Sequence, residues 1–266
     1  MSLRVNTNVE AFNAHRNLSQ TSMGLSKSME KLSSGLRINR AADDAAGLAI
    51  SEGMRAQIRG TAQASRNVQD GISLVQTAEG ALNEVHSILQ RIRELAIQWS
   101  NGTLSTNDQT KITDEVAQLT AELSRIRDSV KFNGIVLFNQ SSTVTITIQA
   151  GANGNVDAPS NGDRVGIAIP PLDVSTISMD VATIDQALTT VSSVRASIGA
   201  FQNRLEHTVA NLAVYQENLT AAESRIRDAD IAAEMVNFTK LQILSQSGTS
   251  MLSQANQLPQ SVLQLL

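Results

Sequence analysis

The chain has 266 residues, a formal net charge of −4, no cysteine and only 3% aromatic residues. The lack of cysteine excludes disulfides and thiolate chemistry, and this charge gives no reason to expect nucleic acid or a membrane as a partner. Enzyme cores of this size normally use more aromatic area, whereas long bundles fill their seams with Leu, Ile, Val and Ala. Composition therefore favours a helical structural protein.

Residues 3–36 carry a first helical pattern, because Leu18, Leu25 and Leu32 recur every seven residues. Ser and Gly disfavour a helix interior, so the Ser-Ser-Gly run at 33–35 predicts the end of this helix. A second row is expected four places beyond each leucine, at Ser22, Met29 and Leu36.

Residues 43–99 predict one very long helix without proline. Asp43 and Asp44 stand at its start, where the helix dipole stabilises acids. Its a/d heptad rows are joined by a third apolar row, and such a wide stripe implies neighbours on two sides. The first row is Val68, Val75, Leu82, Leu89 and Ala96, and the third is Leu74, Ala81, Ile88 and Leu95.

A turn at Asn101-Gly102 separates this helix from a shorter one. Thr106 and Gln109 have the spacing of a capping box, which predicts the start of the shorter helix. Its apolar residues then recur in steps of four and three: Ile112, Val116, Leu119, Leu123, Ile126 and Val130.

The period then changes from helix to strand. Residues 132–134 are turn-like, and apolar residues alternate with polar ones on both sides of a Gly- and Asn-rich segment at 151–163. Two alternating runs around such a segment predict a β-hairpin. The alternating residues are Val144, Ile146 and Ile148, then Val165, Ile167 and Ile169.

Helix is expected again from about Ile184 to the end. Ile198, Leu205 and Leu212 belong to a second heptad row, which should face the first row in an antiparallel bundle, with Leu119 and Leu123 at the side. We therefore expect a mainly α fold, an elongated antiparallel helical bundle or coiled coil with a small β-hairpin insertion. The chain ends on apolar residues, which is unusual for a monomer: Val262, Leu263, Leu265 and Leu266.

No catalytic or phosphate-binding motif occurs, and the three histidines share no metal-ligand spacing. We therefore expect neither an enzyme nor a bound cofactor or metal.

Specific sequence blocks at both ends resemble bacterial flagellin. The N-terminal block is LSSGLRINRAADDAAGLAIS at 32–51, supported by QTAEGAL at 76–82 and QRIRELA at 90–96. At the other end, GAFQNRLE at 199–206 and SRIRDAD at 224–230 are similar to the C-terminal flagellin core. The resemblance covers about four-fifths of the chain, roughly 1–138 and 184–266.

This resemblance implies a structural subunit of the bacterial flagellar filament, extracellular and exported unfolded by the flagellar type III apparatus. Residues 1–42 plus 225–266 would form a terminal inner-tube domain and 43–224 a rod domain, with a short variable insertion at 139–183. The implied partners are further copies of the chain, an export chaperone, and the cap and junction proteins. The terminal helices, including Leu18, Leu25 and Leu32, would assemble with neighbours and are expected to be disordered in the monomer.

The resemblance also implies recognition of the monomer by host toll-like receptor 5. The residues at the matching positions are Arg91, Leu95 and Glu115. Leu95 lies outside the a/d seam, and we expect it to be exposed beside Arg91.

The sequence argues against three other interpretations. A hook–filament junction protein shares the terminal similarity, although the match through 76–96 argues against it. A signalling coiled coil would need a membrane span or a partner module, and neither is seen. The third alternative is an enzyme, because some flagellins carry a zinc-protease insertion. The insertion in this chain is too short for such a domain and lacks the His-Glu-x-x-His motif.

Overall fold

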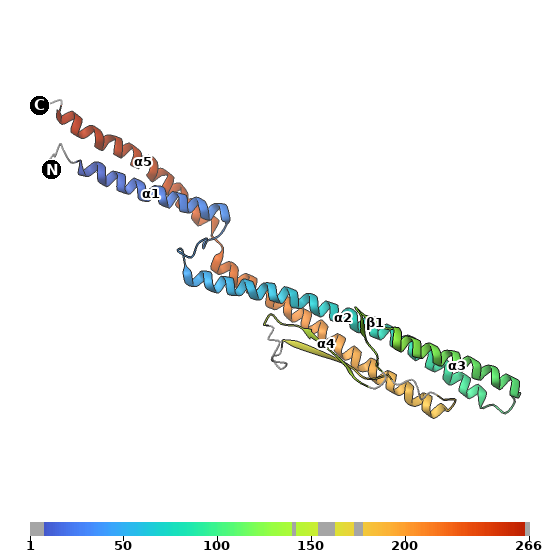
Figure 1. Cartoon of the computed structure of the whole chain (residues 1–266). Helices are drawn as coiled ribbons and strands as arrows, with labels where there is room; N and C mark the ends of the chain where they lie inside the picture. The colour runs from blue at the N-terminus through green and yellow to red at the C-terminus, as the bar shows by residue number, and fades with distance from the viewer. Residues whose placement is uncertain (1–7, 140–141, 154–162, 173–177, 264–266) are drawn as a thin grey trace. The chain divides into compact units, whose positions relative to one another are not determined.

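The structure, a computed structural model, describes residues 8–139, 142–153, 163–172 and 178–263 (Figure 1). The expected fold class, mainly α with a small β-hairpin insertion, is confirmed. The elements in chain order are α1 (Val9–Ser34), α2 (Ala45–Trp99), α3 (Thr106–Ser129), β1 (Lys131–Phe132), β2 (Ile135–Val136), β3 (Val144–Gln149), β4 (Arg164–Ile169), α4 (Val181–Arg227) and α5 (Ile231–Leu263).

Residue contacts divide the chain into two compact units. Unit 1 comprises Met1–Ala56 and Leu219–Leu266, and unit 2 comprises Gln57–Asn218. Of the 31 buried apolar residues in the described part of the chain, only Ile38 and Ala255 belong to unit 1. Almost the whole hydrophobic core is therefore in unit 2.

The helix ends of unit 1 follow from local chemistry. The Asn8 side chain caps α1 by accepting the Ala11 amide at 3.0 Å. Gly35, at φ 72°, ends α1 and donates its N–H to the Lys31 carbonyl at 2.8 Å, as the Ser-Ser-Gly run predicts. Before α2, the Asp44 carboxylate accepts the Gly47 amide at 2.9 Å, so this acid sits at a helix start as expected.

The cap of α3 lies one residue before the predicted position. The Ser105 hydroxyl accepts the Asp108 amide at 3.3 Å and also lies 2.7 Å from the Asp108 carboxylate, to which it donates. Thr106 is instead the first helical residue. The predicted box of Thr106 and Gln109 is therefore wrong by one place, because Ser105 offers the same hydroxyl chemistry in the extended conformation that a cap requires.

The two hairpins form where the sequence changes period. Strands β1 and β2 are joined by Asn133 and Gly134, both with positive φ, the conformation of a tight type I′ turn. Strands β3 and β4 pair antiparallel, with Ile146 opposite Ile167 and Ile148 opposite Val165. The predicted alternating residues thus meet across one face, confirming the hairpin.

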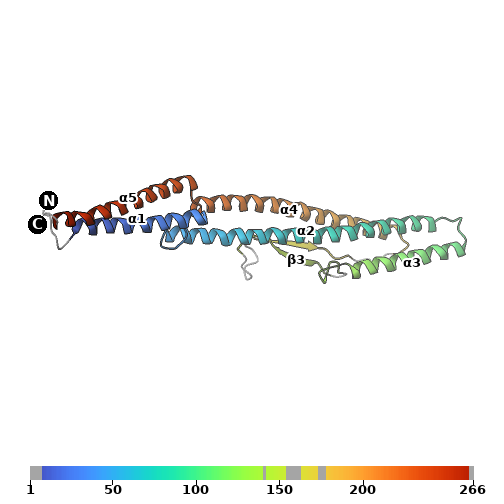
Figure 2. The same cartoon turned by 90° about the horizontal axis from the view of Figure 1, so that it is seen from above.

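Helices α2 and α4 run antiparallel through unit 2 (Figures 1 and 2). Glu79 pairs with Arg195 at 3.9 Å, and Arg93 further along α2 pairs with Asp185, earlier on α4, at 2.6 Å. Both predicted rows are buried: Val75, Leu82, Leu89, Ile198, Leu205 and Leu212.

The two buried rows are offset along the helices. A Cβ placed on Gly71 would lie 3.6 Å from Leu205, so Leu205 lies beside Gly71, before the start of the Val75 row. The glycine leaves room at this point, since the same Cβ would overlap the Ile148 side chain of β3. The hairpin thus packs directly on α2.

Candidate assembly and receptor surfaces

Helices α1 and α5 of unit 1 form an antiparallel pair, side by side in both views (Figures 1 and 2). Asn8 Nδ2, at the start of α1, donates to the Ala255 carbonyl near the end of α5 at 2.7 Å, and the Ser28 hydroxyl donates to the Glu234 carboxylate. The inward residues of α1 are spaced by three and four, as in a coiled coil. They are Ala11, Ala14, Leu18, Thr21, Leu25, Ser28 and Leu32.

The three assembly leucines of α1 are therefore half-buried against α5. The second row stands three places after Leu18 and Leu25, not four. Met29 is 55% exposed, and Ser28 rather than Met29 faces α5. The prediction of that second row is wrong because steps of three and of four both satisfy a heptad, and only the partner helix selects between them.

Small residues bring α1 and α5 close together and leave a groove beside the seam. A Cβ on Gly248 would lie 3.2 Å from Leu18, and one on Gly24 would lie 3.4 Å from Leu241. The groove has a volume of about 620 Å³. We call it the terminal groove, and its apolar lining is Ala14, Leu18, Leu244, Met251 and Ala255.

Unit 1 carries most of the exposed large apolar side chains. Of the seventeen found in the described residues, eleven belong to it. Val262 and Leu263 lie in the last turns of α5, whereas Leu265 and Leu266 lie outside the described residues. The eleven are Val9, Phe12, Met23, Met29, Ile50, Ile231, Met235, Val236, Ile243, Leu244 and Met251.

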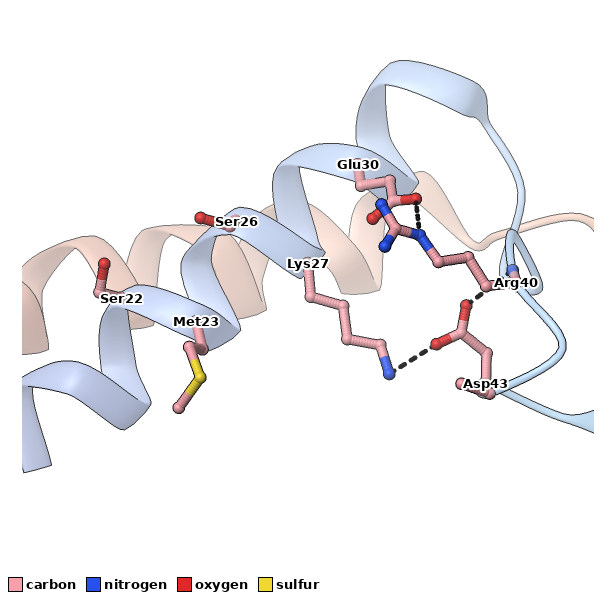
Figure 3. Close-up of a pocket in the computed structure, with 8 residues that line it drawn as sticks. Ser22, Met23, Ser26, Lys27, Glu30, Arg40 and Asp43 are labelled. Atoms are coloured by element: carbon pink, nitrogen blue, oxygen red, sulfur yellow. Dashed lines mark hydrogen bonds and ion pairs between the residues drawn. The ribbon is translucent and has the colours of Figure 1, made fainter. Parts of the chain in front are cut away.

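The segment between α1 and α2 is held by charged side chains (Figure 3). Lys27 Nζ lies 2.6 Å from the Asp43 carboxylate, and Arg40 Nε lies 2.9 Å from Glu30. The hydrogen bond from Lys27, followed by that from the Arg40 amide, lowers the pKa of Asp43 to about 2. Asp43 therefore ties this segment to α1, a role that the sequence did not suggest.

A second set of bonds joins the two segments that link the terminal helices to the rest of the chain. The Arg37 amide donates to the Arg227 carbonyl at 2.7 Å, and the Ala229 amide donates to the Gly35 carbonyl at 2.9 Å. Arg227 Nη1 also donates to Glu52 at 2.6 Å. These bonds join residues 175 or more apart in sequence, so sequence spacing gives no signal for them.

Two of the three predicted receptor residues meet on the surface of unit 2. Arg91 of α2 donates through Nε and Nη2 to Glu115 of α3, at 3.0 and 2.9 Å, and also contacts Glu94. Its hydrogen bond with Glu115 raises the pKa of Arg91. Both groups are exposed, so this pair is an accessible charged feature.

Leu95 is only 2% exposed, which contradicts the expected exposure. The third apolar row of α2, to which Leu95 belongs, is covered by a neighbour, as the width of the stripe itself implied. Leu95 belongs to the hydrophobic core of unit 2.

Among the described residues, no group of three or more His, Cys, Asp or Glu side chains is arranged to hold a metal ion. Within the same residues, no helix combines the length and apolar character that a membrane span requires.

A well-packed helical unit joined to a helix pair with little core and much exposed apolar surface defines a class of protein. This class comprises structural subunits whose exposed apolar surface is covered by other chains. Comparison with known proteins identifies the family. The bacterial flagellin N-terminal helical region matches residues 5–143, and the bacterial flagellin C-terminal helical region matches 181–266.

Full-length relatives agree. A flagellin of Halalkalibacterium halodurans is 53% identical over 98% of this chain and 99% of its own length. A flagellin of Bacillus subtilis is 48% identical, over 99% of this chain and 100% of its own. A flagellar filament 33 kDa core protein of Treponema phagedenis is 47% identical over 98% of this chain and 99% of its own. The chain belongs to the bacterial flagellin family.

As a flagellin, the chain is a structural subunit of the bacterial flagellar filament, which lies outside the cell, and it serves motility. The alternative of a hook–filament junction protein is not favoured, since these flagellins match over almost the whole chain.

Proposed function

We propose that the chain polymerises through its terminal helices, with residues 1–42 plus 225–266 forming the inner tube of the filament and 43–224 a surrounding rod. The observation that carries the proposal is the contrast between the two units. Among its described residues, unit 1 has two buried apolar residues and eleven exposed large ones, so most of this apolar surface is stabilised only when another chain covers it.

Deletion of residues 1–42 and 225–266 tests this division. The remaining chain keeps the core of unit 2, so it should retain a cooperative thermal transition and helical circular dichroism while forming no filaments on seeding. Filaments of the shortened chain, seen by electron microscopy, would contradict the proposal.

The exposed apolar surface of unit 1 also supports the other proposed partners, which are an export chaperone and the cap and junction proteins. Before assembly the exposed apolar side chains of α5 need a cover, which suits an export chaperone, and export through the type III apparatus requires an unfolded chain. The cap and junction proteins would meet the same helices at the filament ends. We propose no catalytic activity, in keeping with the structural role of the family.

A second proposal concerns the host. Toll-like receptor 5 would recognise the monomer at the exposed Arg91–Glu115 pair, because a surface guanidinium in a fixed position is a common hot spot of protein interfaces. Leu95 would act only indirectly, by holding α2 in place.

Arg91→Ala in the monomer should lower receptor activation at least tenfold in a reporter assay. Arg125→Ala is a matched control, since Arg125 forms a similar exposed pair with Glu122 on α3, at 2.6 Å. Full activity of the Arg91 variant, or an equal loss in both variants, would contradict the assignment.

A further inference from the structure

We propose that adjacent copies of the chain join through a contact between two different surfaces, in which Phe12 of one copy enters the terminal groove of the next. This inference rests on the proposed function of unit 1 and names the surfaces that would carry it.

The terminal groove offers an apolar site of suitable size. It measures about 620 Å³ and is walled by Leu18 of α1 and by Leu244 and Met251 of α5. Leu244 is 46% and Met251 60% exposed, so these walls stay largely open to solvent in the single chain. An aromatic ring would bury this apolar area and remove it from water.

Phe12 is the complementary feature. Its side chain is 71% exposed, and burial of an aromatic anchor in an apolar pocket is a common source of binding energy. At about 100° per residue, Phe12 lies about 200° around α1 from Glu10, which lines the groove. Phe12 therefore cannot reach the groove of its own chain.

The occupant that we assign to the groove is a second copy. Glu10 is the only charged residue lining it and has no ion-pair partner among the described residues. Arg16, one helical turn after Phe12, donates to the Asn13 side chain at 2.7 Å and forms no ion pair among the described residues. An inserted Phe12 would bring the cation of one copy near the acid of the next, so the two surfaces match in charge as well as in shape.

Phe12 is the knob of this contact, and the terminal groove is the site that receives it. Because the two are different surfaces of one helix pair, the contact is heterologous. Such contacts leave a free Phe12 at one end and a free groove at the other, and they extend into an open helical polymer where the rotation between copies does not close a ring. Phe12 and the groove occupy the same level of α1, so the two copies would lie side by side.

Disulfide mapping tests the contact cleanly, because the chain has no cysteine of its own. Phe12→Cys and Met251→Cys subunits are mixed, grown into filaments from wild-type seeds and oxidised. The control mixture replaces Phe12→Cys with Ser19→Cys, on the same flank but about 10 Å along α1. We expect at least tenfold more crosslinked dimer with Phe12→Cys than with Ser19→Cys. Equal yields, or dimers between two Phe12→Cys chains, would overturn the proposal.

Variants without cysteine give an independent measure. Phe12→Ala, which empties the knob, and Ser247→Trp, which blocks the rim of the groove, should each raise the critical concentration for polymerisation at least tenfold. The double variant should be no worse than either single one, since both remove the same contact. Ser250→Trp, an exposed α5 position outside the groove, should polymerise normally.

These outcomes separate the two proposals. Wild-type polymerisation by Phe12→Ala and Ser247→Trp overturns the Phe12 contact and leaves assembly through unit 1 intact. Filaments of the chain without its terminal segments overturn assembly through unit 1 itself. If a variant forms no filament at all, the crosslinks are measured on the short oligomers that it does form, with the same criteria.

Discussion

Thr61 shows how a single polar atom affects stability in this protein. It lies on α2 with 0% exposure, and its hydroxyl is buried without a hydrogen-bond partner. An unsatisfied buried hydroxyl costs about 1–3 kcal/mol, because the group loses water and gains nothing in return.

Thr61→Val should therefore stabilise the protein by about 1–2 kcal/mol, since valine has the same shape without the hydroxyl. Thermal unfolding followed by circular dichroism measures the change. Thr77→Val is the control, because the Thr77 hydroxyl is exposed and bonds the Ser73 carbonyl at 2.8 Å. A Thr61→Val variant less stable than wild type would show that the hydroxyl has a partner after all.

At the residue scale, the ionisation of Asp43 makes stability depend on pH. Its pKa falls from 3.8 to about 2 on folding, chiefly because Lys27 stabilises the carboxylate. The stability that it contributes is therefore fully present above pH 4 and is lost as the pH falls towards 2.

Hydrogen exchange of the Asn39 and Arg40 amides, both 3.2 Å from Asp43, measures this contribution. Asp43→Asn should speed their exchange at pH 5, and the difference from wild type should shrink as the pH approaches 2. Asp70→Asn is a control at an exposed acid of unit 2. A difference between wild type and Asp43→Asn that does not change with pH would contradict the role of the charge.

At the scale of elements, α2 and α4 both contribute buried residues to the hydrophobic cluster of unit 2. Leu205→Ala should cost about 2–5 kcal/mol, because Leu205 is fully buried beside Gly71 and its removal leaves a cavity. Thermal melting of the subunit measures the loss. Val214→Ala, at a 58% exposed position of α4, should change stability little. An unchanged melting temperature for Leu205→Ala would rule out the assigned packing.

Most elements could be predicted from the sequence, since heptad and alternating patterns identify long helices and a hairpin before any partner is known. Ser-Ser-Gly at the end of α1 and Asn133-Gly134 in the turn carry their conformation in their own chemistry. The wide apolar stripe of α2 already indicates that the row of Leu95 is covered, but the sequence does not show which neighbour covers it. The same limit applies to Ser28 and Met29, and to Asp43, whose partners come from other segments.

At the scale of the molecule, the two units should differ in how firmly they hold their structure. Amides of α1 and α5 should exchange quickly in the monomer and slowly in filaments, because neighbouring copies supply the missing apolar cover. Amides in the buried stretch of α2 around Leu82 should be protected in both states. Hydrogen exchange with mass spectrometry compares the two, and strong protection of α1 in the monomer would show that unit 1 is stable alone.

The bond between Asn8 and Ala255 joins positions 247 residues apart. A chain that leaves the ribosome or a narrow export channel from its N-terminus can therefore fold unit 2 while its last helix is still inside. The helix pair of unit 1 closes only after the final residues have emerged. The surface proposed to accept another copy thus requires α5, so a chain that stops before α5 should not join the growing polymer.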